Sequence, residues 1–133
     1  MPVSIAPQAI ARHWNPLDGD PWGAGVDPRE VERALHEGRF EARPYSSVRD
    51  GAYDHAARIA YLVQHPSRDP IHIDVGVPSL GLVVRWPITD GNHRLAAALV
   101  RGDCAIEAEV SGSVGYAEDL FDVRIDEDTF EAA

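Results

Sequence analysis

The spacing of apolar residues between positions 71 and 110 constrains the fold more than any other feature of this sequence. Apolar residues first occupy every second position, as in a half-buried strand, at Ile71, Ile73, Val75 and Val77. We predict that a strand over 82–89, an alanine-rich helix over 92–101 and a strand over 104–110 follow. This order predicts an α/β (α+β) domain with a small mixed β-sheet flanked by helices.

Two more helices are predicted before this region. Asp27 suits a helix N-cap, Pro28 suits the first helical position and Gly38 suits the end, which predicts a helix over 28–37. A second helix is predicted over 51–65, because its apolar residues fall on one face and a proline follows it.

The two ends of the chain differ in composition from its middle. The first 28 residues hold five of the ten prolines, so we expect residues 1–27 to form an arm without regular structure. This arm is expected to pack Trp14 and Trp22 against the domain, with a partner-binding surface as the alternative. A short helix is predicted over 115–121, and residues 118–133, with seven acids and one base, are expected to form a solvated, partly ordered acidic tail.

Length, charge and composition exclude several classes of protein. The 133 residues fit one domain, whose core is expected at about 53–112. A net charge of -10 disfavours nucleic acid and anionic lipid as partners. No apolar run reaches the roughly 20 residues of a membrane span, and no signal peptide is visible. The single cysteine, Cys104, has no partner for an internal disulfide, so a cytoplasmic protein is expected.

The segment Asp90-Gly91-Asn92-His93-Arg94 joins a predicted strand to a predicted helix. A helix that starts here presents its first free N–H groups and the positive end of its dipole to one point, which attracts anions. Gly91 lets a ligand approach the backbone, and Arg94 can fork onto phosphate oxygens. Asp90 could cap the helix, orient Arg94, or hold a magnesium ion beside a phosphate. A purely structural, capped turn is the alternative.

Other polar residues are explained without a functional site. His72 and Asp74 are two apart on one predicted strand, and Glu107 and Glu109 on another, a spacing that could serve a metal ion or an acid/base pair. A solvent-facing strand surface is the preferred explanation for both pairs. His55 and His65 are ten residues apart and do not share a helix face. No group of residues predicts a metal site.

The order of these elements, with the turn among them, resembles the ParB/sulfiredoxin-like superfamily over about 53–112. In that superfamily the matching turn holds nucleotide phosphates, and it is similar to the Gly-Cys-His-Arg of sulfiredoxins. The resemblance implies that Gly91, His93 and Arg94 contact phosphate. In the resulting hypothesis Asn92, His93 and Arg94 bind the phosphate through backbone and side chains. Asp90 and His93 become the catalytic candidates, with Asp90 positioning a metal ion or the attacking group.

This chain also departs from the superfamily. Asn92 stands where sulfiredoxins have their nucleophilic cysteine, so sulfiredoxin chemistry is not expected. The helix before Pro66 lacks the polar side chains that hold the nucleotide in sulfiredoxins, since it has Asp54, Ala57 and Tyr61 at the comparable positions. The chain has neither the length nor the charge for the basic helix-turn-helix domain of ParB proteins.

These observations predict a nucleotide- or phosphate-binding domain that uses nucleotide with magnesium. Phosphoryl transfer and nucleotide hydrolysis are left open as reactions. Replacement of Arg94 by alanine is expected to abolish binding and to leave the fold intact. The rival function is a non-catalytic acidic protein, such as an inhibitor or DNA mimic, that retains the fold and binds a basic protein partner through its acidic surface.

Overall fold

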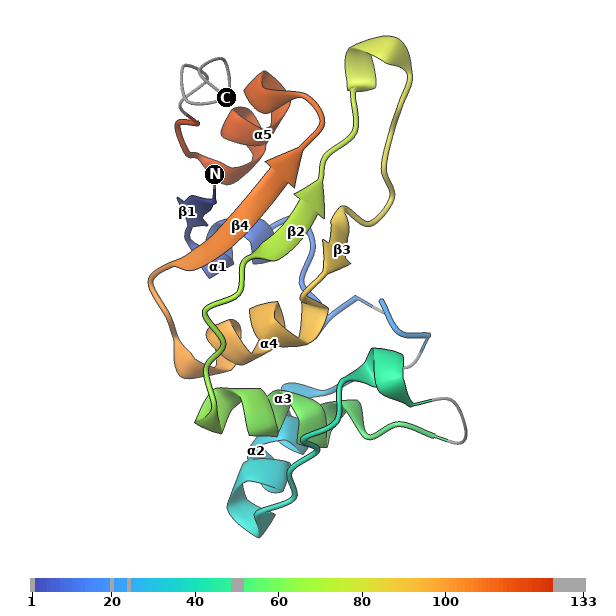
Figure 1. Ribbon diagram of the computed structural model, residues 1–133, viewed down its shortest axis with the longest axis vertical. Helices are drawn as coiled ribbons and strands as arrows, with labels where there is room; N and C mark the ends of the chain where they lie inside the picture. The colour runs from blue at the N-terminus through green and yellow to red at the C-terminus, as the bar shows by residue number, and fades with distance from the viewer. Residues whose placement is uncertain (1, 20, 24, 49–51, 126–133) are drawn as a thin grey trace.

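The computed structural model describes residues 2–19, 21–23, 25–48 and 52–125. It contains a four-stranded sheet in the order β1-β4-β2-β3, formed by β1 (Val3–Ile5), β2 (Ile71–Asp74), β3 (Ile88–Asp90) and β4 (Ile106–Ser111) (Figure 1). β2 and β4 pair in parallel, with Ile71 opposite Ala108, while β1 and β3 add to the two edges in antiparallel orientation. The prediction of a small mixed sheet in an α+β domain is confirmed.

Five α-helices and two short 3-10 helices complete the described chain: α1 (Pro7–Ala11), α2 (Pro28–Glu37), η1 (Tyr45–Ser47), α3 (His55–Gln64), η2 (Pro78–Leu80), α4 (Asn92–Arg101) and α5 (Val114–Phe121). α4 packs against the sheet, α3 packs against α4, and α2 packs against α3, so these helices lead away from the sheet in series (Figure 1). α1 and α5 pack against each other, and α5 also contacts β4. None of the described helices is long and apolar enough to cross a membrane.

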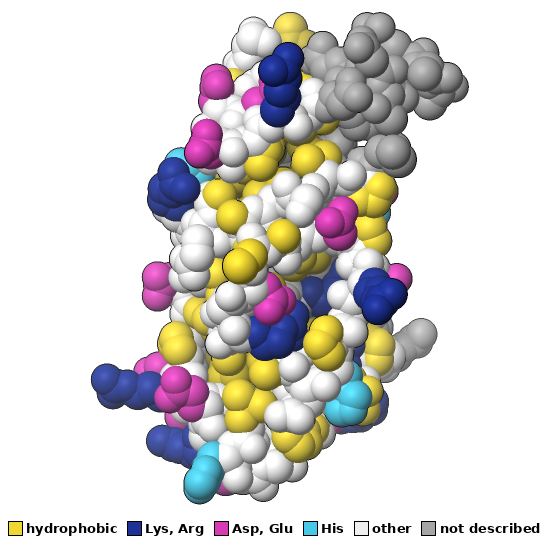
Figure 2. Space-filling model, turned by 90° about the vertical axis from the view of Figure 1, so that its left-hand side faces the viewer, with side chains coloured by type: hydrophobic (Ala, Val, Ile, Leu, Met, Phe, Trp, Pro, Cys, Tyr) yellow, Lys and Arg dark blue, Asp and Glu magenta, His cyan; other side chains and the backbone are white. Residues whose placement is uncertain are grey.

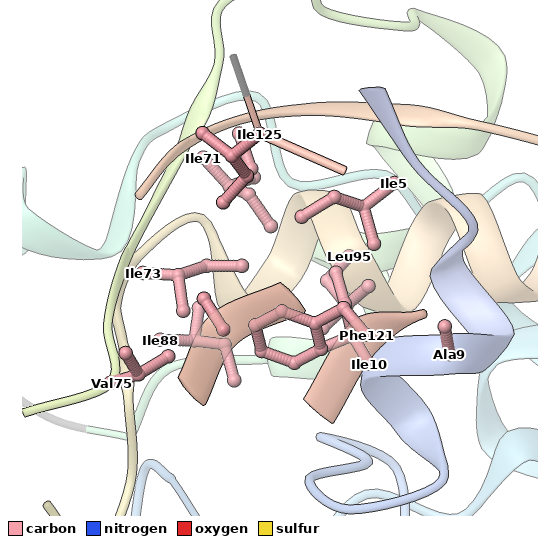
Figure 3. Packing of buried hydrophobic residues seen from close by; sticks show 12 residues of the cluster. Ile5, Ala9, Ile10, Ile71, Ile73, Val75, Ile88, Leu95, Phe121 and Ile125 are labelled. Carbon is pink, nitrogen blue, oxygen red and sulfur yellow. The ribbon is translucent and has the colours of Figure 1, made fainter. Parts of the chain in front are cut away.

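Helix α4 takes part in two separate hydrophobic clusters. Its Leu95 is buried in a cluster between the sheet and helices α1 and α5, in which Phe121 lies close to Ile10 and Ile88 (Figure 3). Its Ala96 and Ala97 are buried in a second cluster with residues of α2 and α3. Packing on two sides therefore holds the start of α4 in a defined position.

Local capping signals explain the two helices whose predicted bounds agree with the structure. The carboxylate of Asp27 accepts a hydrogen bond from the backbone N–H of Arg29 at the start of α2. Gly38 ends α2 in the left-handed conformation, with φ 70°, and Gly102 ends α4 in the same way, with φ 74°. These boundaries follow from residues next to one another in the chain.

The prediction of no regular structure before Asp27 is wrong for residues 3–11. β1 pairs with β4, and Pro7 starts α1 at a position where a helix needs no N–H group. Ile5 and Ile10 are buried in the core as a result. The expected packing of Trp14 is found, since it contacts this core and its indole Nε1 donates to the carbonyl of Arg85 at 3.2 Å.

The helix predicted over 115–121 is found as α5, but the expectation that residues 118–133 are solvated is wrong at two positions. Phe121 and Ile125 are buried in the core, at 1% and 5% exposure. Residues 126–133, which carry four of the seven acids, lie outside the described residues. A truncation meant to remove only the acidic end must therefore start at Asp126.

Other elements are shorter than predicted. β2 ends at Asp74 rather than at 77, because Gly76 takes a positive φ of 71° and turns the chain. The strand expected over 82–89 is paired as β3 only from Ile88, apart from one isolated bridge at Leu82. α3 starts at His55 rather than at 51, where the carboxylate of Asp54 caps it by accepting from the N–H of Ala57.

Candidate functional site

The start of α4 differs from the starts of the other long helices. The side chain of Asp27 caps α2, that of Asp54 caps α3 and that of Ser113 caps α5. At α4 the N-cap is Gly91, and no side chain accepts from the first turn. The first backbone bond inside this helix runs from the N–H of Leu95 to the carbonyl of Gly91 at 2.9 Å. The earlier N–H groups of α4 are therefore left without a capping side chain.

Arg94 and Asp90 face each other across this turn. Nη2 of Arg94 donates to Oδ2 of Asp90 at 3.1 Å, so Asp90 orients Arg94 and does not cap the helix. Nη1 of Arg94 donates to the carbonyls of Asp69 and Pro70 at 2.8 and 3.2 Å. A guanidinium has five N–H donors, and these bonds use three. Arg94 is thus a structural link that retains donors for a ligand.

Asn92 and Gly91 both have structural reasons for their place in the turn. Oδ1 of Asn92 accepts from the indole of Trp86 at 2.8 Å, and its Nδ2 donates to the carbonyl of Ile88 at 3.0 Å. Gly91 has a φ of 97°, and a Cβ atom there would lie 2.3 Å from Cγ2 of Ile71. The backbone N–H of Asn92, rather than its side chain, is the group left for a ligand.

His93 forms a hydrogen-bonded pair with a residue that the sequence did not single out. Nε2 of His93 lies 2.8 Å from Nδ1 of His55, and the ring planes differ by 9°. The ring centres are 5.1 Å apart, while the two facing nitrogens are only 2.8 Å apart. Rings stacked face to face would keep all of their atoms farther apart than these nitrogens are. The two imidazoles therefore lie edge to edge in one plane and are not stacked face to face.

Aromatic residues enclose this imidazole pair. The ring of Trp22 lies nearly parallel to both imidazoles, with centroid distances of 4.3 Å to His93 and 4.8 Å to His55, so the indole covers the hydrogen bond between them. Tyr45 and Tyr53 meet His55 edge-on, at 4.8 and 5.1 Å. Trp22 also confirms the expectation that the N-terminal arm packs its tryptophans against the domain.

The environment keeps both imidazoles neutral at physiological pH. Burial, followed by the nearby His55 and Arg58, lowers the pKa of His93 from 6.5 to about 3. Burial also lowers the pKa of His55, and the charge of Asp54 opposes this shift. One of the two nitrogens that face each other must then carry the shared hydrogen as donor while the other accepts it.

A cavity of about 780 Å³ opens in front of this turn. Its walls come from the N-terminal arm at Trp22, from η1, from α3 at Arg58, from the segment 67–72 and from residues 89–94. All five predicted site residues, from Asp90 to Arg94, line it. His93 reaches the cavity wall, whereas His55 lies behind it and is only 8% exposed. Sites for small ligands commonly have volumes of about 300–1,000 Å³.

Several of the polar residues weighed in the sequence lie elsewhere or have other partners. Asp74 accepts from the N–H of Gly76 at 2.9 Å, whereas His72 is exposed and lines the cavity. Glu107 is exposed on β4. In the described part of the chain no three His, Cys, Asp or Glu residues are grouped as a metal site would require.

The sequence pointed to His93 and to the packing of Trp22 against the domain, but it did not predict that Trp22, His55 and Tyr45 meet at His93. His55 precedes the apolar stripe of α3, and Trp22 and Tyr45 lie in segments without periodicity, so spacing along the chain gave no signal for them. The one sequence feature that Trp22, Tyr45, Tyr53 and His55 share is that they lie in or next to segments rich in proline and glycine.

Comparisons with protein-family models, with curated proteins and with solved structures found no match for this chain. The resemblance to the ParB/sulfiredoxin-like superfamily therefore stays a prediction that rests on the order of the elements and on the turn.

Proposed function

We propose that the cavity at the start of α4 binds a phosphate-bearing ligand of nucleotide size. The observation that carries this proposal is the uncapped first turn of α4, whose residues Gly91 to Arg94 line a cavity of about 780 Å³. Backbone N–H groups at a helix start, together with the helix dipole, favour an anion.

Two arginines support an anionic ligand. Arg58 and Arg94 both line the cavity, and backbone carbonyls hold each of them in place. Nη1 of Arg58 donates to the carbonyl of Ala42 at 2.8 Å, and Nη1 of Arg94 donates to the carbonyl of Asp69 at 2.8 Å. A side chain that is held before the ligand arrives loses little further freedom on binding. Each guanidinium keeps N–H groups beyond those used in these bonds.

Aromatic rings and carboxylates on the same walls fit the remainder of a nucleotide. Trp22 and Tyr45 line the cavity, and Tyr45 is 43% exposed, so its ring is accessible to a flat ligand group. Asp69 and Asp90 would be the carboxylates available to magnesium, which proteins often hold through one or two carboxylates and the substrate phosphates.

The rival function, an acidic protein that binds a basic partner, has less support. The face shown in Figure 2 carries acidic and basic side chains interspersed rather than one continuous acidic patch. Residues 126–133, which hold four of the seven acids of the tail, lie outside the described residues.

Calorimetric titration with ATP, ADP, CTP and GTP plus magnesium, and with inorganic phosphate alone, tests the proposal. His72→Glu places a negative charge on the cavity wall, and His36→Glu makes the same change of charge at an exposed site on α2. We expect His72→Glu to weaken binding at least about fivefold, the effect of roughly 1 kcal/mol of repulsion, and His36→Glu to leave it unchanged. Absence of binding by the wild-type protein, or equal affinities for both variants, would contradict the proposal.

A further inference from the structure

Only one ring nitrogen of His93 is free to meet a ligand. Nε2 faces Nδ1 of His55 at 2.8 Å, and the ring lines the cavity, so Nδ1 is the polar atom that a ligand can contact. In the described part of the chain, Arg39 Nε is the buried side-chain nitrogen or oxygen without a hydrogen-bond partner, so Nδ1 of His93 is not shut off from the cavity. It is therefore accessible from the cavity.

The proton of a neutral imidazole decides what Nδ1 offers. When the hydrogen of the pair sits on Nδ1 of His55, this nitrogen donates to Nε2 of His93, and His93 must carry its own hydrogen on Nδ1. When it sits on Nε2 of His93, Nδ1 of His93 has only a lone pair. The first arrangement presents a donor to the cavity, and the second presents an acceptor.

We propose that His55 is a positioning residue that makes His93 a neutral hydrogen-bond donor to a phosphate oxygen in the cavity. This inference rests on the proposed function. A phosphate oxygen accepts hydrogen bonds, and the neighbouring N–H groups of α4, Arg58 and Arg94 are donors as well. A lone pair on Nδ1 would repel the oxygen that these donors attract.

The required form of His93 needs a partner that donates to Nε2, and Nδ1 of His55, at 2.8 Å, is the group in place to do so. Trp22 covers the bond, and the rings of Tyr45 and Tyr53 meet both imidazoles edge-on, so the two rings stay in one plane. The charged groups that face the pair or share its cavity wall are Asp54 at the N-cap of α3, Arg58 on α3, Asp69 before β2, Asp90 in β3 and Arg94 on α4.

The alternative route to a donor is protonation of His93, and its surroundings oppose it. Burial, followed by the nearby His55 and Arg58, lowers the pKa of His93 to about 3, so the imidazolium form is scarce at neutral pH. The position of the hydrogen in the neutral pair therefore decides whether His93 attracts or repels an anion.

Two substitutions of His55 test this inference. Asn carries an N–H donor near the position of Nδ1, so His55→Asn keeps a donor to His93, whereas His55→Leu keeps the bulk and removes it. With ADP and inorganic phosphate as probes, we expect His55→Leu to lose roughly ten- to hundredfold in affinity, and His55→Asn to bind like the wild-type protein. His36→Leu, at an exposed histidine, is the control, and thermal unfolding of each variant shows that it folds.

Nitrogen-15 NMR of labelled histidine in the ADP complex reads the hydrogen directly. We expect His93 to be protonated on Nδ1 and unprotonated on Nε2, and His55 to be protonated on Nδ1. A complex in which His93 carries its hydrogen on Nε2, or in which both nitrogens are protonated, overturns the inference. So does wild-type affinity in a folded His55→Leu variant, and in that case the proposed function still stands. If the wild-type protein binds neither probe, the proposed function fails and the inference fails with it.

Discussion

Arg94 donates a hydrogen bond from Nη1 to the backbone carbonyl of Asp69 at 2.8 Å, and so ties the first turn of α4 to the segment that enters β2. The same side chain also binds the carbonyl of Pro70 and the carboxylate of Asp90, and it is 18% exposed. A residue expected only to contact phosphate thus has a structural role as well.

Replacement of Arg94 by alanine should therefore reduce stability as well as remove a donor from the cavity. We expect a loss of about 1–3 kcal/mol in the free energy of unfolding, because three hydrogen bonds are lost, one of them to the part-buried carbonyl of Pro70. Arg68→Ala removes the same charge at an exposed side chain and should change stability by less than about 0.5 kcal/mol. Urea denaturation measures both, and equal stabilities would show that the contacts of Arg94 contribute nothing. Binding data for Arg94→Ala need this measurement beside them.

Gly91 and Gly102 both have positive φ angles, but only a side chain at Gly91 would collide with a neighbour. Comparing alanine at the two positions therefore separates the cost of the strained backbone from the cost of the steric conflict. At Gly102 no atom lies within 4 Å of the position that a Cβ would take, so Gly102→Ala should cost about 1–2 kcal/mol through its φ of 74° alone. At Gly91 the Cβ would also lie 2.3 Å from the buried Ile71, so Gly91→Ala should cost about 2–5 kcal/mol. Chemical denaturation compares the two variants, and a cost at Gly91 no larger than at Gly102 would refute the steric argument.

The histidine pair predicts a loss of stability in acid. Because the pKa of His93 is about 3 in the folded protein and 6.5 without the fold, the unfolded chain binds more protons between these values. The stabilisation is complete above pH 6.5 and is lost as the pH falls towards 3, with a slope of up to about 1.4 kcal/mol per pH unit for one proton. His55, whose pKa is also lowered, adds to the same trend.

Denaturation with urea across this pH window tests the prediction. His93→Asn removes one titrating ring and should show a shallower decline than the wild-type protein. His36→Asn removes an exposed histidine and should follow the wild-type curve. The attribution to His93 would be untenable if all three proteins lost stability with the same slope.

Much of the secondary structure could be predicted because its signals are local. Asp27 and Gly38 bound α2, and Gly91 and Gly102 bound α4, through contacts between neighbours in the chain. The ends of the chain could not be predicted in this way. β1 exists because it pairs with β4, about a hundred residues later, and the burial of Ile125 depends on the same core.

The sequence by itself determined the turn from Asp90 to Arg94, because a strand, a glycine and an alanine-rich helix follow one another there. Only the tertiary structure decided what surrounds this turn. The packing of α3 on α4 brings His55 to His93, and the N-terminal arm lays Trp22 over both. Residues 22, 55 and 93 share no period along the chain, so their contact arises from the packing of separate helices and from no local preference.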